Sequence, residues 1–187
     1  MRIFWRAVLL TALSLAYVEL AGHPGHARAD NESAGAYFDR GVELHKKGDV
    51  AGAIAEYRAG LRIDPNHSRL HNNLGSALKV AGDLDGAITE YRTSVRLDPD
   101  YVVARSNLGR TLESKGDLDG AIAEYRAIVR LNPKDLETHL DLAMVLQAAG
   151  NKPEAKKEFQ EVLGLLPNTP QNQSVISQIK DKIREVE

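Results

Sequence analysis

The chain has 187 residues, with 24 Lys plus Arg against 26 Asp plus Glu, so its formal net charge is −2. This near balance gives no electrostatic reason to expect a nucleic-acid partner. The chain has no cysteine, which excludes disulfides, thiolate metal sites, a cysteine nucleophile and a lipid anchor on an N-terminal cysteine. Hydrophobic residues make up 43% of the sequence, so a packed core is expected.

The first 29 residues differ in composition from the rest. A start with two arginines precedes an uncharged, mostly apolar stretch of 12 residues, whereas a membrane-spanning helix needs about 20. A polar stretch then ends in Ala27-Arg28-Ala29, a pattern of small residues typical of a signal-peptide cleavage site. We predict that residues 1–29 are a signal peptide cleaved before Asp30, with an uncleaved membrane anchor as the alternative. The protein is then exported, to a bacterial-type periplasm or the medium, and is not a lipoprotein.

A 34-residue period organises the chain after this segment. Four consecutive units share a Gly-Asp or Gly-Asn pair, an alanine, an aromatic residue and a proline, and the second and third units are identical at 18 of 34 positions. Internal similarity at a fixed period indicates stacked structural units. The recurring residues include Gly48, Gly82, Gly116 and Gly150; Ala53, Ala87, Ala121 and Ala155; Tyr57, Tyr91, Tyr125 and Phe159; and Pro65, Pro99, Pro133 and Pro167.

Each unit is predicted to form two short helices. In the second unit, leucines at i, i+4 and i+8 mark one face of a helix over 68–81. Gly82 ends this helix because glycine adopts the left-handed conformation without strain, and Asp83 caps the next one. In the fourth unit Asn151 is the predicted cap, with Glu154 three residues later. Strand-type alternation is absent from the sequence, so the predicted fold class is all-α.

A 34-residue helix–turn–helix with Leu-Gly in its first helix, Ala and Tyr in its second and a closing Pro resembles the tetratricopeptide repeat. The resemblance implies a right-handed α-solenoid of four units, 34–67, 68–101, 102–135 and 136–169, within a domain over 30–169. It also implies close helix crossings at the small residues Gly41, Gly75, Gly109 and Ala143.

A stacked array needs a capping element at its end. Residues 170–187 are predicted to form this capping helix. Its apolar stripe consists of Val175, Ile176, Ile179, Ile183 and Val186.

The family resemblance further implies that the first helices of successive units line a concave groove that holds peptides. The sixth position of each unit would face this groove, and carboxamides there can both donate to and accept from a peptide backbone. The expected groove residues are Asp39, Arg69, Asn73, Lys79, Asn107, Arg110, Glu137 and Asp141, with Ser76, Glu113 and Gln147 beside them. The middle of this groove is basic and amide-rich and its C-terminal end is acidic, which suits a segment with an acidic middle.

Some family members that serve chaperones hold a C-terminal carboxylate with a Lys-Asn-Asn-Lys-Arg set. In the first-to-third register the positions are Phe38, Val42, Asn73, Val103 and Asn107, and one repeat later they are Asn72, Ser76, Asn107, Glu137 and Asp141. Neither register retains the lysines or the arginine, and each keeps only one of the two asparagines in place. Binding of cytosolic chaperone tails is therefore not expected.

The sequence offers little for catalysis. Motifs for a nucleophilic serine, a zinc-binding helix, a phosphate loop or a cofactor are absent, so we expect no catalytic, cofactor or metal site. His67 and His71 are four residues apart, but no third ligand follows at a suitable spacing. The repeated Gly-Asp-Leu-Asp-Gly string resembles part of a calcium loop but lacks its later glutamate.

The predicted function is that of an exported, non-catalytic scaffold. It would bind a protein or an extended peptide in its groove and serve complex assembly, envelope organisation or secretion. Three alternatives remain from the sequence: a structural protein that self-associates as a homo-oligomer, a subunit of an enzyme, and a membrane-tethered adaptor. No nucleic-acid partner is expected, and no membrane span remains after signal cleavage.

Overall fold

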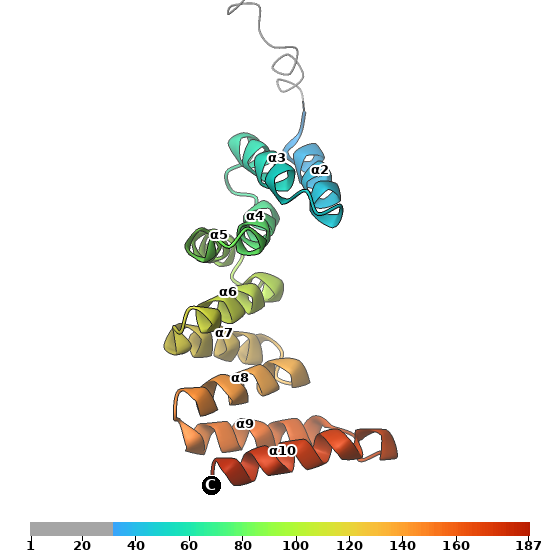
Figure 1. Cartoon of the computed structure of the whole chain (residues 1–187), viewed down its shortest axis with the longest axis vertical. Coiled ribbons are helices and arrows are strands. Elements are labelled where there is room, and N and C mark those ends of the chain that lie inside the picture. Colours follow the sequence, from blue (N-terminus) through green and yellow to red (C-terminus); the bar gives the residue numbers. More distant parts are fainter. Residues whose placement is uncertain (1–31) are drawn as a thin grey trace, which may run out of the picture.

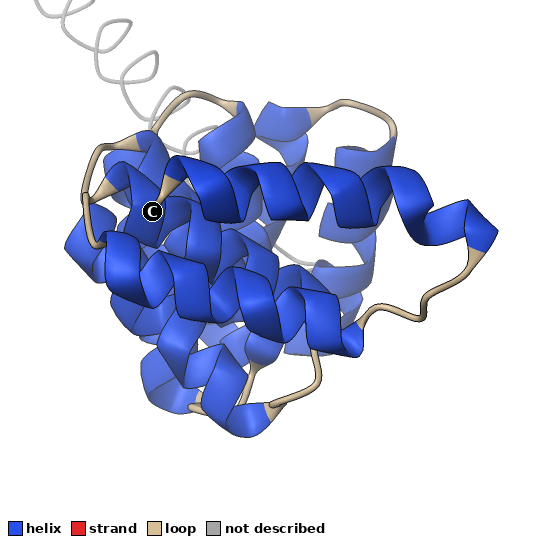
Figure 2. Ribbon diagram, turned by 90° about the horizontal axis from the view of Figure 1, so that it is seen from below, coloured by secondary structure: helices blue, strands red, loops and turns tan. Residues whose placement is uncertain are grey.

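The computed structural model describes residues 32–187, so the predicted signal peptide and its cleavage site lie outside the described residues. Within the described range the chain is helical and contains no strand (Figures 1 and 2). Its elements are α2 (Ala34–Lys46), α3 (Val50–Ile63), α4 (Ser68–Val80), α5 (Leu84–Leu97), α6 (Val102–Ser114), α7 (Leu118–Leu131), α8 (Leu136–Ala148), α9 (Lys152–Leu165), the 3-10 turn η2 (Pro170–Asn172) and α10 (Gln173–Glu185). The all-α prediction is confirmed.

The helices stack as four consecutive pairs. The most extensive packing joins the two helices of each unit, α2 with α3, α4 with α5, α6 with α7 and α8 with α9. The second helix of each unit then packs against the first helix of the next. The result is an arched α-solenoid whose core runs continuously between the helices (Figure 1).

The turn inside each unit has the predicted geometry. Gly48, Gly82, Gly116 and Gly150 have φ values between 77° and 86°, the left-handed region that favours glycine. The aspartate that follows the first three of these glycines caps the next helix, and its carboxylate accepts a hydrogen bond from the backbone N–H three residues on at 2.9 Å.

The fourth turn differs from the prediction. Asn151 occupies the N-cap position but makes no side-chain cap bond to the backbone of α9. Its amide instead donates to Oε2 of Glu154 at 2.8 Å, and Glu154 also pairs with Arg126 of α7. The side chain of Asn151 therefore bonds to the carboxylate of Glu154 and does not cap the helix as predicted.

The predicted close crossings lie at the centre of each unit. A Cβ added at Gly75 would lie 2.8 Å from the ring of Tyr91, and one at Gly109 would lie 2.9 Å from the ring of Tyr125. In the fourth unit Ala143 and Phe159 take these places, and both are fully buried. The crossing therefore requires a small residue under each aromatic ring.

Helix α10 closes the C-terminal end of the stack by packing on α9. Ile179 and Val186 are buried, and Ile176 and Ile183 are half-buried, as the predicted stripe requires. Val175 departs from the prediction because its side chain is 41% exposed. It lies in the first turn of α10, at the end that projects past the neighbouring helix (Figure 2).

Candidate functional site: the inner face of the helical stack

One side of the arch is formed by the first helices of the units. Helix α4 contacts both α2 and α6, so these helices lie side by side, and α8 continues the row (Figure 1). Two open pockets lie along this row, one between α2 and α4 and one between α6 and α8. We call this surface the groove and name the two hollows the α2–α4 pocket and the α6–α8 pocket.

The α2–α4 pocket has a volume of about 330 Å³. Its floor includes Tyr57, a fully buried aromatic of the unit core. Burial raises the pKa of the Tyr57 hydroxyl, and a hydrogen bond from Asn73 acts in the opposite direction. The predicted groove residue Asn73 thus contacts the pocket floor. The lining consists of Val42, His45, Lys46, Tyr57, Asn73 and Ser76.

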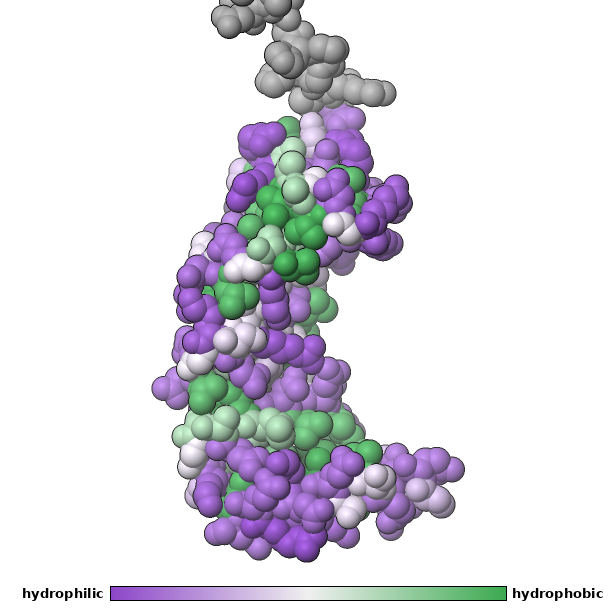
Figure 3. Space-filling model, viewed as in Figure 1, coloured by the Kyte–Doolittle hydropathy of each residue, from purple (hydrophilic) through white to green (hydrophobic). Residues whose placement is uncertain are grey.

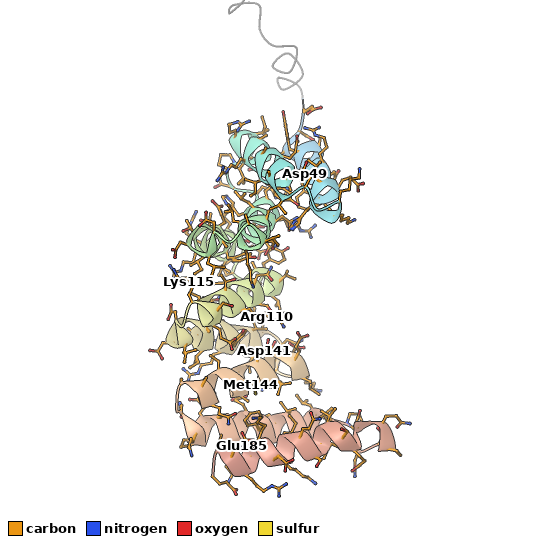
Figure 4. The ribbon with its side chains drawn as sticks, in the orientation of Figure 1. Asp49, Arg110, Lys115, Asp141, Met144 and Glu185 are labelled. Atoms are coloured by element: carbon orange, nitrogen blue, oxygen red, sulfur yellow. The ribbon has the colours of Figure 1, made fainter. Side chains whose placement is uncertain are left out.

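The α6–α8 pocket has a volume of about 290 Å³. It brings together four of the predicted groove residues, Asn107 and Arg110 from α6 with Glu137 and Asp141 from α8. The guanidinium of Arg110 pairs with Glu137, and its Nη2 lies 3.2 Å from Oδ2 of Asp141. Figure 4 labels Arg110 and Asp141 one above the other along the stack. Val102, Val103, Ser106, Asp135 and Thr138 complete the lining.

These ion pairs shape the electrostatics of the α6–α8 pocket. Burial raises the pKa of Asp141, and Glu137 raises it further, while Arg110 lowers it without cancelling the shift. The pKa of Arg110 is raised above its ordinary value, chiefly by its hydrogen bond to Glu137. The positive charge that the sequence placed at Arg110 is therefore engaged by carboxylates, and the basic character of the middle of the groove rests on Arg69 and Lys79.

The remaining predicted residues are dispersed. Asp39 and Arg69 are exposed and Lys79 is half-buried, and none of the three lines either pocket. Arg69 lies close enough to Tyr101, the residue before α6, to oppose electrostatically the rise that burial causes in the pKa of that tyrosine.

A buried asparagine joins the two pockets. Asn72 is only 3% exposed; its amide donates to Oδ1 of Asn73 at 3.1 Å, and its own Oδ1 accepts from Nδ2 of Asn107 at 3.0 Å. The sequence reasoning gave Asn72 no role, because the fifth position is Phe38, Ser106 or Leu140 in the other units. The available signal was that Asn72 is polar at a position where two of the other units have an aromatic or aliphatic residue.

Apolar side chains are also exposed in and beside the groove. Val103 is 53% exposed in the α6–α8 pocket, and Met144 of α8 is 44% exposed. The space-filling view shows a hydrophobic band across α8, and Met144 is labelled on this helix in Figure 4 (Figures 3 and 4). The groove therefore combines charged, carboxamide and apolar contacts.

The histidines considered as metal ligands have other partners. Nδ1 of His67 accepts a hydrogen bond from the backbone N–H of Leu70 at 3.3 Å and so caps α4. His71 lies between Glu90 and the carbonyl of Pro65. Within residues 32–187 no group of three or more His, Cys, Asp or Glu side chains could hold a metal ion.

His71 belongs to a contact that recurs in three units. His71, Arg105 and His139 each bridge a glutamate of the second helix, Glu90, Glu124 and Glu158, and the carbonyl of the preceding proline. Both partners of each ring are acceptors, so the two histidines satisfy them only when both ring nitrogens carry protons. His71 therefore lies at an interhelical packing position.

Among the described residues, no helix is both long enough and apolar enough to cross a membrane.

Three family models match the chain. Two described as tetratricopeptide repeat match residues 72–135 and 112–179, and one described as TPR repeat matches residues 36–80. Together they extend over the four units and into the capping helix. The chain belongs to the tetratricopeptide repeat family.

Solved structures have the same architecture. MamA is 24% identical, with a TM-score of 0.68, and the match covers 82% of this chain and 85% of that chain. YrrB, described as a TPR protein with an unusual peptide-binding site, is 19% identical with a TM-score of 0.68 over 84% of this chain and 88% of that chain. The first TPR domain of Spaghetti (RPAP3), bound to an HSP90 peptide, is 26% identical with a TM-score of 0.60 over 64% of this chain and 95% of that chain. The chain has no match among curated proteins.

Proposed function

We propose that the chain is a non-catalytic tetratricopeptide scaffold that binds another protein through an extended peptide segment in the groove. The observation that carries this proposal is the pair of open pockets of about 330 and 290 Å³ along one row of first helices. Repeat proteins use such extended concave surfaces for binding. The peptide-bound domain of Spaghetti and the peptide-binding protein YrrB support the same use of this fold.

The composition of the groove suits a peptide backbone with side chains of mixed character. A carboxamide has two donor hydrogens and an acceptor oxygen, so Asn73 and Asn107 retain hydrogen-bonding capacity beyond their bonds to Asn72. The exposed Val103 and Met144 offer apolar area that a partner would remove from water. The carboxamides can therefore bind the main chain of a peptide while the pockets hold its side chains.

We further propose that the scaffold acts after export, in complex assembly, envelope organisation or secretion. The proposal rests on the charged start, short apolar stretch and Ala27-Arg28-Ala29 pattern of the sequence. N-terminal sequencing of the protein from the periplasm of an expressing bacterium is expected to give a start at Asp30. A start at Met1 in the membrane fraction would instead indicate the tethered adaptor.

The experiment on the groove uses two matched valines. A random peptide library is selected on the purified protein, and the affinity of a selected peptide is measured for Val103→Ser, in the α6–α8 pocket, and Val80→Ser, outside both pockets. Both valines are more than half exposed, at 53% and 64%, so neither change opens the core. We expect Val103→Ser to weaken binding several-fold and Val80→Ser to leave it unchanged. Failure to select any peptide, or equal effects of the two changes, would exclude the groove as the binding site.

A further inference from the structure

The two pockets of the groove carry opposite charge. The described residues that line the α2–α4 pocket include His45 and Lys46 and no carboxylate. Those that line the α6–α8 pocket include three carboxylates, and Arg110 is their one cation. The charge of the groove therefore changes sign between the second and third units.

Side chains outside the pockets extend this difference. Lys79 of α4 is the repeat equivalent of His45 of α2, 34 residues earlier. Arg69, a predicted groove residue, lies in the first turn of α4. Asp39 is the one carboxylate among the predicted groove residues of these two units. In the third unit the equivalent of Lys79 is Glu113, which accepts a hydrogen bond from the hydroxyl of Tyr125 at 3.4 Å. Units one and two thus carry net positive charge along the groove, and units three and four carry net negative charge.

The excess negative charge persists although Arg110 is in place. The pKa of Asp141 is raised by burial and by Glu137, against the opposing effect of Arg110. The pKa of the buried Tyr125 is raised by burial first, and then by Asp141 and Glu113. At Tyr125 the two carboxylates raise the pKa more than Arg110 lowers it, which is the direction that surplus negative charge produces, since it disfavours another negative charge nearby.

Each charged pocket also has an apolar wall. Val42 lines the α2–α4 pocket, and Val102 and Val103 line the α6–α8 pocket beside the carboxylates. Lysine and arginine have long apolar stems that pack on such surfaces while the charged end stays near water or a counter-charge. The α6–α8 pocket therefore fits a basic side chain better than a small cation.

We propose that the groove selects an extended peptide segment with separated charges, whose acidic residues face units one and two and whose lysine or arginine enters the α6–α8 pocket. This inference rests on the proposed function and specifies its partner. Between the two charged regions, the carboxamides of Asn73 and Asn107, which the buried Asn72 links, face the uncharged middle of the segment.

The row of helices also sets the spacing of the charges. The pockets are two helix steps apart, and packed helices lie about 8–10 Å from one another, so the separation is roughly 20 Å. An extended chain advances about 3.3–3.6 Å per residue, so about six residues separate the acidic and basic groups of the partner.

Three synthetic peptides of equal length test the proposal. One carries two glutamates and two lysines separated by six serine and valine residues; the others carry four glutamates or four lysines at the same positions. Fluorescence anisotropy is expected to show the mixed peptide binding at least tenfold more tightly than either uniform peptide, with the difference reduced in high salt. Equal affinities, or tighter binding of a uniform peptide, would overturn charge-separated recognition and leave groove binding in place. No binding by any of the three would count against both.

Charge reversals locate the effect. Glu137 has a 72% exposed side chain, so Glu137→Lys is expected to preserve the helicity measured by circular dichroism. This variant should bind the mixed peptide about tenfold more weakly and the all-glutamate peptide more tightly than the unchanged protein does. Glu161→Lys makes the same change at an exposed position of α9 outside both pockets and is expected to alter neither affinity. The same shift in both variants would show that net charge, and not the α6–α8 pocket, governs binding.

The other pocket has its own pair of variants. Lys46→Glu, in the α2–α4 pocket, is expected to weaken the mixed peptide by several-fold, whereas Lys157→Glu, exposed on α9, is expected to have no effect. A loss in Lys157→Glu that equals the loss in Lys46→Glu would overturn the assignment of the acidic end to units one and two.

Discussion

The helix crossing within each unit is nearly constant along the chain, whereas the groove changes from one unit to the next. Glycine under tyrosine recurs in three units and alanine under phenylalanine in the fourth, and these aromatic rings are fully buried. The next residue of each first helix, at the ninth position of its unit, is successively Val42, Ser76, Arg110 and Met144. Of two positions on the same helices, one is thus nearly constant among the four units and the other differs in each.

The difference follows from what each position contacts. At the crossing, a residue meets the ring of its own unit at van der Waals distance, so every unit imposes the same limit on size. In the groove, a residue meets solvent, a neighbouring unit or a partner, and packing sets no common requirement. The contacts that stabilise the stack are therefore nearly the same in every unit, whereas the side chains that line the groove differ between units.

The largest expected effect comes from breaking the constant part. Gly75→Leu would place a Cβ 2.8 Å from the Tyr91 ring and 3.2 Å from the carbonyl of Ala87, so the two helices must separate. Overpacking of this kind costs about 1–3 kcal/mol. Denaturant unfolding followed by circular dichroism should show this loss in the free energy of unfolding.

Gly164 supplies the control for this change. It lies in α9, and a Cβ there would meet nothing within 4 Å. Gly164→Leu is expected to leave stability unchanged or to raise it by up to about 1 kcal/mol, because glycine is a poor helix former. A similar loss in both variants would mean that the close crossing does not limit residue size.

A smaller effect distinguishes the histidine units from the arginine unit. Burial lowers the pKa of His71 and of His139, but hydrogen bonds to Glu90 or Glu158 and to a proline carbonyl outweigh it, so both pKa values are raised above 6.5. Arg96 opposes this rise at His71, and Glu161 reinforces it at His139. A raised pKa in the folded state gives stability that is complete below the ordinary pKa and is lost as pH rises through the folded pKa.

The free energy of unfolding is therefore expected to fall as pH rises above about 6.5, the ordinary pKa of histidine. Arg105 makes the same two contacts, to Glu124 at 2.7 Å and to the carbonyl of Pro99 at 2.7 Å, and it stays charged throughout this range. The double variant His71→Arg, His139→Arg should flatten the pH dependence measured by thermal unfolding. An unchanged slope would show that the contacts of His71 and His139 do not set the pH dependence.

The features that could be predicted from sequence are those that recur within one unit. The repeat period, the turn at Gly82, the cap at Asp83 and the crossing at Gly75 each depend on contacts between residues less than 34 positions apart. Such contacts follow from backbone conformation and side-chain size. They recur in three or four of the units, so the same pattern can be recognised several times in one sequence.

The features that escaped prediction depend on how one unit sits on the next. Arg110 pairs with Asp141 of the next unit, and Asn72 bonds to Asn107 of the next unit. Asn151 bonds to Glu154, which itself pairs with Arg126 of the preceding unit. All of these are long or polar side chains with several available partners. A repeat pattern places these residues on the right face but does not select the rotamer or the partner. The sequence thus places the groove residues on the inner helices, whereas the distribution of charge over the two pockets could be seen only in the structure.

The smallest expected effect concerns an ion pair that joins two units on the surface. Arg126 of α7 contacts Glu154 of α9 through two nitrogens, with the closest approach at 2.6 Å, and this contact lowers the pKa of Glu154. The Arg126 side chain is 44% exposed, so solvent screens the attraction, and exposed pairs of this kind contribute about 0.2–1 kcal/mol. Arg126→Ala is expected to lower the free energy of unfolding by no more than this amount, and the loss should shrink in high salt. Arg92→Ala is the equivalent change one unit earlier, where Gly120 stands at the position equivalent to Glu154, and it serves as the reference. If the two variants lose the same stability at low salt, the pair does not bind the third unit to the fourth, and the stack depends on its repeated core alone.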